Sequence, residues 1–358
     1  MNAAVEATAP GKLVLLGEYA VLEGAPAVVT AVARRARVRL RVTEAPGWRV
    51  TAPGLLDGPA EATVEAGGTL RWRDPEAGAR LELLSGLVRA MAAAGLADPG
   101  RTPALELELD TTAFFQEALP GRHKLGLGSS AALTVALAVA LAAAGGGEGV
   151  PAPEGGWLPA LVRLHRAAQG GRGSGIDVAA SLLGGIVRYR LGEGGRPEAA
   201  PAALPGGLGL RFVWTGRSAG TAGFLARLAA ALESDRSGVR ARLDTLADLA
   251  RRGAAALTER APEPFLGVVS AYGEAMAALG REAGIPILSP EHEALAALAA
   301  EAGVAYKPSG AGGGDLGVAF AADPAALDRF ARLAASAGFA PLSLPLDRDG
   351  AVVDTVPA

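Results

Sequence analysis

Cysteine is absent from this 358-residue sequence, and histidine occurs only as His123, His165 and His292. Without cysteine the chain can form no disulfide, use no thiolate nucleophile and build no cysteine-ligated zinc site. Three scattered histidines do not indicate a histidine-rich metal centre either. These absences exclude thiol chemistry and the common zinc sites.

Lysine is also scarce. Arginine supplies nearly all of the positive charge, and only Lys12, Lys124 and Lys307 are lysines. A compact ammonium group on a flexible stem is not interchangeable with a planar guanidinium group, so these three positions are candidates for function. The alternative is that they survive by chance in an arginine-rich composition.

The charge and apolar content indicate a globular protein. Half of the residues are apolar, a fifth are charged and the net charge is -3, so the basic footprint of a nucleic-acid-binding protein is missing. The longest apolar stretch, residues 131–144, is too short to span a bilayer, and the first residues lack the pattern of a secretory signal. We expect a cytoplasmic monomer or homodimer that acts on a small molecule, with no nucleic-acid or membrane partner.

The order of the expected elements predicts an α+β protein with two lobes. Period-two alternation predicts strands between residues 3 and 45 and over 104–110, whereas helical spacing predicts helices near 80–94 and 158–169. Further strands are expected at 185–191, 208–216 and 341–346, and further helices up to residue 302 and near 324–337. The segment 193–207 is rich in glycine and proline and is interpreted as a loop or lobe junction. We therefore divide the chain into lobes 1–195 and 196–358.

The strongest single motif is a glycine and serine segment that leads into an apolar helix. It consists of Gly126, Leu127, Gly128, Ser129, Ser130, Ala131 and Ala132. Glycines let a ligand approach the backbone closely, and the start of a helix offers unpaired amides at the positive end of its dipole, so the segment predicts a phosphate cradle. A helix capped by Ser129 or Ser130 is the simpler alternative. The G-x-G-x-x-A spacing also leaves a dinucleotide-binding turn open, but no Walker A motif occurs.

A second glycine-rich segment follows Lys307. It contains Ser309, Gly310, Ala311, Gly312 and Gly313, and it continues through Gly314 to Asp315. Such a run between a helix and a strand predicts a nest of backbone amides suited to phosphate. A long flexible hairpin would look the same.

Two shorter segments carry candidate catalytic side chains. Lys12 stands at the beginning of an apolar strand that is followed by Glu18 and Tyr19. In the segment 173–181, Ser174 precedes Asp177 by three residues, which is the spacing of a capping box. The functional alternative is that Asp177 lies at a helix start, where the dipole favours its charged form, and points into a cleft.

Taken together and in this order, the four segments resemble the GHMP kinase superfamily. The resemblance implies an amino-terminal lobe like ribosomal protein S5 domain 2 and a ferredoxin-like carboxy-terminal lobe. It also implies ATP and Mg²⁺ as cofactors, Lys12 and Asp177 as the catalytic pair, and Gly126 to Ala132 as the loop that binds the ATP phosphates. Ser130 is the expected Mg²⁺ ligand. Mevalonate kinases bring a glutamate to the metal from about eleven residues before the aspartate, whereas here that stretch reads His165-Arg166.

Within the superfamily, the sequences GEYAVLEG, GSGIDVAAS and KPSGAGGGD are most similar to the phosphomevalonate kinases. This resemblance implies transfer of phosphate from ATP to 5-phosphomevalonate. The residues expected around the acceptor are Glu18, Tyr19, Lys124, Arg172, Ser174, Lys307, Ser309, Gly310, Ala311, Gly312 and Gly313, with Arg122 and Arg217 as weaker candidates. The alternatives are a kinase of mevalonate or another small alcohol, and a catalytically silent ATP-binding regulator.

Overall fold

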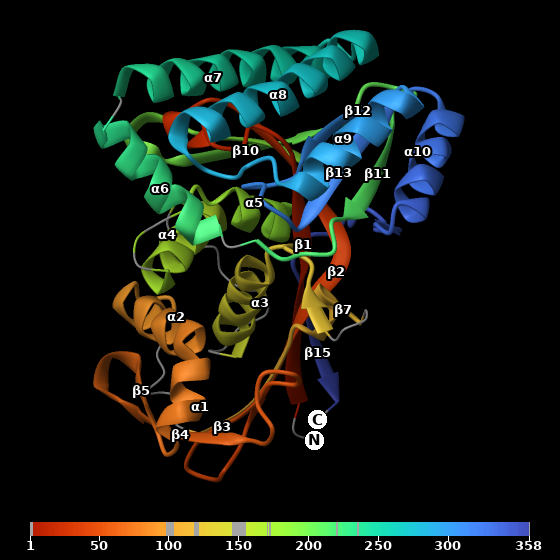
Figure 1. The fold of residues 1–358 in the computed structure, drawn as a ribbon. Coiled ribbons are helices and arrows are strands. Elements are labelled where there is room, and N and C mark those ends of the chain that lie inside the picture. Colours follow the sequence, from red (N-terminus) through yellow and green to blue (C-terminus); the bar gives the residue numbers. More distant parts are fainter. Residues whose placement is uncertain are drawn as a thin grey trace.

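The computed structural model describes residues 3–97, 104–117, 122–144, 155–169, 171, 173–219, 221–234 and 236–357. Within these ranges the chain forms two lobes, each built on its own sheet and covered by helices (Figure 1). The two-lobed α+β class predicted from the sequence is therefore confirmed.

The strands are β1 (Ala3–Leu16), β2 (Ala27–Val42), β3 (Gly47–Thr51), β4 (Ala60–Glu65), β5 (Thr69–Trp72), β6 (Ala104–Asp110), β7 (Phe115–Glu117), β8 (Arg122–Lys124), β9 (Ile186–Leu191), β10 (Pro197–Ala202), β11 (Gly209–Trp214), β12 (Ala305–Pro308), β13 (Leu316–Ala321), β14 (Ala340–Leu342) and β15 (Val352–Pro357). The helices are η1 (Ala20–Glu23), η2 (Ala66–Gly68), α1 (Pro75–Arg80), α2 (Glu82–Ala93), η3 (Thr112–Phe114), α3 (Ser129–Ala144), α4 (Trp157–Ala168), α5 (Ile176–Leu183), η4 (Glu193–Gly195), α6 (Thr221–Ser234), α7 (Arg236–Thr258), α8 (Pro262–Ala283), α9 (Pro290–Ala302) and α10 (Pro324–Ser336).

The sheet of the amino-terminal lobe is organised around the long strand β2. Over the described residues its strands follow the order β10-β9-β2-β6-β3-β4-β5, and β1 pairs with both β2 and β15. In β2, Val38 and Leu40 are buried, whereas Arg37 and Arg41 face solvent and form ion pairs with glutamates of β6. The alternation in the sequence correctly predicted a sheet with one wet face.

Helix α3 lies at the centre of the amino-terminal lobe. It packs against β1 and β2 and is covered by α2, α4 and α5, so it is buried on all sides between Ala131 and Leu141. An apolar helix without a polar face is stable only in such a position. Its first turn is consequently fixed against the strand that carries Lys12.

The carboxy-terminal lobe is a four-stranded sheet, β12-β13-β11-β14, between two helical layers. Helix α8 covers the face formed by Phe212, Val318 and Phe320, and the ring of Phe265 meets that of Phe320 edge-on at 5.7 Å. Helices α9 and α10 cover the opposite face, where they bury the neighbouring strand residues. Strand alternation therefore distributes side chains to two cores.

The sequence did not predict β3, β4, β5, β7, β8 and β12, and two further strands, β10 and β15, depart from the expected lobe organisation. The segment 193–207 is not a simple loop, because residues 197–202 form β10, which pairs with β9. Strand β15, which was not foreseen, returns to the amino-terminal lobe and pairs antiparallel with β1. Both strands extend the first sheet beyond the predicted lobe 1–195, and the boundary between residues 195 and 196 remains a prediction.

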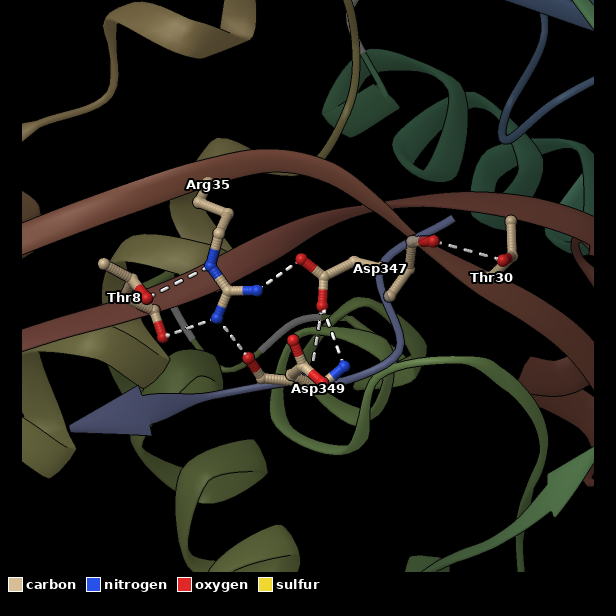
Figure 2. Close-up of polar contacts among 7 residues, drawn as sticks. Thr8, Thr30, Arg35, Asp347 and Asp349 are labelled. Atoms are coloured by element: carbon tan, nitrogen blue, oxygen red, sulfur yellow. Dashed lines mark hydrogen bonds and ion pairs between the residues drawn. The ribbon is translucent and has the colours of Figure 1, made fainter. Parts of the chain in front are cut away.

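A buried cluster attaches the segment before β15 to the amino-terminal lobe (Figure 2). Arg35 donates to the carboxylate of Asp347, to the carbonyl of Gly350 and to Thr8, and the Asp347 side chain is only 5% exposed. The other Asp347 oxygen accepts hydrogen bonds from the amides of Asp349 and Gly350 at 3.1 and 3.2 Å. The backbone of Asp347 also accepts from Gly185, just beyond the end of α5. The cluster thus links the tail to the helix that carries Asp177.

None of the helices in the described ranges combines the length and the apolar character that a membrane-spanning helix requires.

Replacing Asp347 with alanine should lower the free energy of unfolding by about 2–3 kcal/mol, because it leaves the Arg35 guanidinium and two backbone amides without their acceptor. Urea denaturation measures this change. The matched control is Asp349→Ala, which removes an exposed carboxylate from the same turn and should stay within about 0.5 kcal/mol of the wild type. Equal losses in the two variants would show that the Asp347 carboxylate has no special role.

Candidate active site

A cavity of about 720 Å³ opens between the two lobes. The amino-terminal lobe contributes β1, the residues that follow it, the end of β8 and the starts of α3 and α5, whereas the carboxy-terminal lobe contributes residues near 218–225 and 309–315. The predicted site residues that line it are Lys12, Glu18, Tyr19, Lys124, Gly126, Gly128, Ser129, Ser130, Ser174, Asp177, Ser309, Gly310 and Ala311. All four sequence segments therefore meet in one place.

Lys12 and Asp177 face each other in this cavity. The Lys12 Nζ atom lies 3.8 Å from the Asp177 Oδ2 atom, and the two side chains are 11% and 34% exposed. Lys12 is held on β1, where its amide donates to the carbonyl of Leu127 at 2.9 Å. Asp177 lies in the first turn of α5, whose N-cap is Gly175 and not Ser174, so a capping box does not account for its side chain. An ammonium group and a carboxylate therefore both face the cavity.

The glycine loop before α3 lies directly beside this pair. Gly126 and Gly128 have positive φ values of 72° and 74°, and α3 begins at Ser129. The amides of its first turn have no carbonyl partner earlier in the helix, which makes this helix start a site for an anion. Leu127, Ala131 and Ala132 are buried in the core, so their side chains hold the loop in place and do not line the cavity.

A Cβ atom on Gly128 would have no free space. Built in ideal geometry, it would lie 3.0 Å from Cε of Lys12 and 3.5 Å from Oδ2 of Asp177. The positive φ and this close contact therefore favour glycine where the loop approaches Lys12 and Asp177.

Two side chains contact the hydroxyl of Ser130: His165 in α4 and Gln169, the C-cap residue of that helix. Gln169 donates to Ser130 Oγ at 3.1 Å, and His165 Nε2 lies 3.4 Å from the same oxygen. Burial lowers the pKa of His165, and the nearby Asp177 only partly opposes this shift. Because burial favours the neutral imidazole, His165 orients the Ser130 hydroxyl without adding a fixed positive charge.

The residues present fit a Mg²⁺ ion that arrives with the nucleotide. In the described part of the chain no three acidic or histidine side chains form a metal cluster. The cavity nevertheless offers the hydroxyl of Ser130 and the carboxylates of Asp177 and Asp315. Mg²⁺ in phosphotransferases is commonly held by one or two carboxylates together with substrate phosphates and water, and this donor set matches that pattern.

The carboxy-terminal glycine segment contributes its first residues and its last residue, Asp315, to the cavity. Ser309, Gly310 and Ala311 line it, whereas Gly312 and Gly313 pack against Ile287 and Phe224. The amide of Gly313 donates to the carbonyl of Ile287 at 2.8 Å. Gly312 and Gly313 therefore shape the loop and do not line the cavity, and their expected contact with the acceptor stays a prediction.

Lys307 is not at the cavity surface, in contrast to its expected acceptor contact. Its side chain is fully buried, and its ammonium donates to Oε1 of Glu18 and to the carbonyl of Pro308. Burial lowers the pKa of Lys307, and the Glu18 carboxylate opposes this shift. The amide of Gly310 donates to the same Glu18 oxygen at 3.1 Å. The lysine therefore fixes an acidic residue of one lobe to the glycine loop of the other.

Two further bonds join the lobes at the same place. The Tyr19 hydroxyl donates to the carbonyl of Ala311, and the Ser309 hydroxyl donates to the carbonyl of Val14 at 2.9 Å. Tyr19 adopts a positive φ of 61°, which is uncommon for a bulky residue and is maintained here by burial on both sides. Beside it, Val14, Val21, Leu22 and Leu225 form an apolar wall of the cavity.

The remaining predicted basic residues differ in their placement. Lys124 lines the cavity, and its carbonyl accepts a hydrogen bond from Ser218 at 2.9 Å. Arg217 points elsewhere and lies 3.6 Å from Glu291. Arg172 and the side chain of Arg122 lie outside the described residues.

The sequence analysis did not assign a role to several lining residues. Gln169, Ser218 and Ala219 reach the cavity from segments for which no ligand role was predicted, and Asp315 also lines it. Asp315 had one usable signal, since it ends the second glycine segment immediately before a strand.

With this geometry in place, comparisons with known proteins define the family. The model for the GHMP kinases N terminal domain matches residues 86–185, and that for the GHMP kinases C terminal domain matches residues 265–338. The sequence is 32% identical over 338 residues to the phosphomevalonate kinase of Streptomyces sp. (strain CL190), covering 87% of this chain and 88% of the relative. The chain therefore belongs to the GHMP kinase family, and its fold is the GHMP kinase fold.

Two further relatives are similar to this chain. The mevalonate kinase of Aeropyrum pernix is 29% identical over 193 residues, which cover 54% of this chain and 52% of the relative. The structure of Streptococcus pneumoniae phosphomevalonate kinase in complex with phosphomevalonate and AMPPNP superimposes with a TM-score of 0.72 at 19% identity, covering 96% of this chain and 99% of that chain. The second match demonstrates a shared fold.

A Gly128→Ala substitution should reduce phosphoryl transfer at least about 100-fold, because the added methyl group strains the loop at a positive φ and displaces the Lys12 side chain. The measurement is steady-state turnover together with the thermal midpoint of unfolding. Gly303→Ala is the matched control, since Gly303 has a similar φ of 72° but nothing within 4 Å of the point where a Cβ atom would lie. A comparable loss of turnover in the control would attribute the effect to backbone strain alone.

Proposed function

We propose that this protein transfers the terminal phosphoryl group of ATP to 5-phosphomevalonate, forming 5-diphosphomevalonate in the mevalonate route to isoprenoids. The observation that carries the proposal is the 3.8 Å approach of Lys12 to Asp177 in a cavity lined by glycine segments from both lobes. The similarity to the Streptomyces phosphomevalonate kinase over 87% of the chain supports this acceptor. We further propose that the protein acts in the cytoplasm as a monomer or homodimer.

A phosphate acceptor determines what the catalytic pair has to do. The second pKa of a phosphate monoester is about 6, so its attacking oxygen is already ionised at neutral pH. No residue then has to remove a proton from a weakly acidic alcohol. In this mechanism Asp177 orients the Lys12 ammonium, and Lys12 neutralises the charge that spreads over the transferred group.

The rest of the cavity positions the two phosphorylated compounds. The start of α3 and the loop from Gly126 bind the ATP phosphates, while Ser309, Gly310 and Ala311 face the acceptor together with Tyr19. Ser130 and the carboxylates of Asp177 and Asp315 would hold Mg²⁺, which would supply positive charge to the bound phosphates. The apolar wall beside Tyr19 suits the hydrocarbon part of a small acid.

Mevalonate itself is the second candidate acceptor. The similarity to the Aeropyrum mevalonate kinase extends over 193 residues, and both acceptors share the same carbon skeleton. Against it, Lys124 adds a cation to the cavity. A cation at this point favours the more negatively charged acceptor.

The direct test is ADP release with ATP and each of 5-phosphomevalonate, mevalonate and a panel of sugars. The expected result is that 5-phosphomevalonate has the highest kcat/KM. A higher value for mevalonate would overturn the acceptor assignment but leave the kinase class intact. If the protein binds ATP but forms no ADP with any of these acceptors, it is a catalytically silent regulator.

A Lys124→Ala substitution should raise the KM for 5-phosphomevalonate about tenfold, because it removes one charge-assisted contact to the acceptor phosphate. The KM for mevalonate, measured in the same variant, should change little. Arg217→Ala is the matched control, since Arg217 is paired with Glu291 outside the cavity lining. Equal changes in KM for both acceptors would refute the contact with the acceptor phosphate.

An Asp177→Asn substitution should lower kcat at least about 100-fold and leave KM within about threefold. The reason is that Asp177 orients Lys12 toward the transferred group and does not contribute to substrate binding. Wild type and variant should both lose kcat/KM as the pH falls through the second pKa of the acceptor phosphate, about 6. Paired pH profiles measure this. An ionisation that is present in the wild type and missing from the variant would show that Asp177 acts as a general base.

A further inference from the structure

Asp315 joins the two glycine segments of the cavity. It follows Gly314 at the start of β13 and adopts a positive φ of 55°. Its carbonyl accepts hydrogen bonds from the amide and the hydroxyl of Thr215, both at 3.0 Å, and its amide donates to the carbonyl of Arg217 at 2.7 Å. Three backbone contacts therefore fix the direction in which its side chain leaves the chain.

The carboxylate of Asp315 packs against the first glycine of the phosphate loop. A Cβ atom on Gly126 would lie 2.4 Å from Cγ and 2.5 Å from Oδ2 of Asp315. The other oxygen, Oδ1, accepts from the amide of Ala219 at 3.2 Å. Gly126 must therefore be a glycine to leave room for a carboxylate from the opposite lobe.

This placement is unusual for an anion-binding site. A carboxylate beside a phosphate loop repels a polyphosphate unless a cation stands between them. Burial raises the pKa of Asp315, while the amide of Ala219 and the charges of Lys12 and Lys124 favour its ionised form. Lys12 and Lys124 thus favour the ionised form of Asp315, and this form repels a phosphate group that carries no metal.

The charges of the described lining residues cancel. Lys12 and Lys124 stand against Asp177 and Asp315, and Glu18 is neutralised by the buried Lys307. The helix dipole at the start of α3 adds only a partial positive charge. Side chains in the described part of the cavity therefore do not supply the net positive charge that a nucleoside triphosphate requires.

We propose that Asp315 makes this cavity selective for nucleotide that carries a divalent cation, by repelling the uncomplexed triphosphate and accepting the metal-bound form. The inference rests on the proposed function, because it takes ATP as the ligand of the glycine loop. Asp315 is in this view a specificity-determining residue at the nucleotide phosphates, distinct from the catalytic pair.

An Asp315→Asn substitution isolates the charge. Asparagine keeps the oxygen that accepts from Ala219, has nearly the same shape beside Gly126 and tolerates a positive φ. Any change in nucleotide binding then follows from the loss of the negative charge. Asp315→Gly is a second variant that preserves the backbone conformation should the amide fail to pack.

The experiment is calorimetric titration of AMPPNP, a non-hydrolysable analogue, once in excess Mg²⁺ and once with the metal chelated by EDTA. The wild type should bind the metal-bound nucleotide more tightly than the free one. Asp315→Asn should bind free AMPPNP about tenfold more tightly than the wild type, and its binding in Mg²⁺ should be unchanged or weaker. The ratio of the two dissociation constants therefore falls at least about tenfold.

The control and the outcomes separate this inference from the proposed function. Asp328→Asn removes a carboxylate of the same lobe that is 52% exposed and paired with Arg211, and it should leave the ratio unchanged. An unchanged ratio in Asp315→Asn and Asp315→Gly, or parallel weakening with and without Mg²⁺, would overturn the role of Asp315 while the nucleotide site stands. No AMPPNP binding to the folded wild type in either condition would remove the proposed function itself.

Discussion

Lys12 and Gly128 pack so closely that one methyl group on the glycine would lie 3.0 Å from Cε of the lysine. This approach requires β1 and α3 to be rigid relative to each other, which the burial of α3 on all sides provides. The amide of Lys12 bonds to the carbonyl of Leu127, so strand and loop are also joined through the backbone. The core of the amino-terminal lobe thus determines how closely the glycine loop lies against the lysine.

The sequence predicted those parts of the molecule in which local pattern and tertiary role agree. The period-two alternation around Val38 and Arg39 identified the half-buried sheet, and the apolar helix after Gly128 marked the element around which the lobe is built. Glycines with positive φ, such as Gly126, also stood out, because no other residue fits there. The cavity could therefore be anticipated from the four segments before their spatial arrangement was known.

Other features depend on contacts between distant segments and leave little trace in the sequence. Lys307 was expected to bind the acceptor. Instead its ammonium forms a buried ion pair with Glu18, which lies 289 positions away in the sequence. The strand at 197–202 contains alanines and prolines, and it forms because β9 offers an edge. The role of Asp315 emerges only when Gly126 is seen opposite to it. In each case the deciding partner belongs to another part of the chain.

The pairing of β15 with β1 also bears on how the protein is made. Strand β1 is synthesised long before β15, yet one edge of residues 3–8 pairs with residues 352–357. Throughout synthesis this half of β1 therefore presents an open edge to which other chains can add. Domains normally fold in the order in which they are translated, whereas here the first sheet is completed only after the second lobe has been synthesised. Until β15 covers it, that edge favours association of nascent chains with one another.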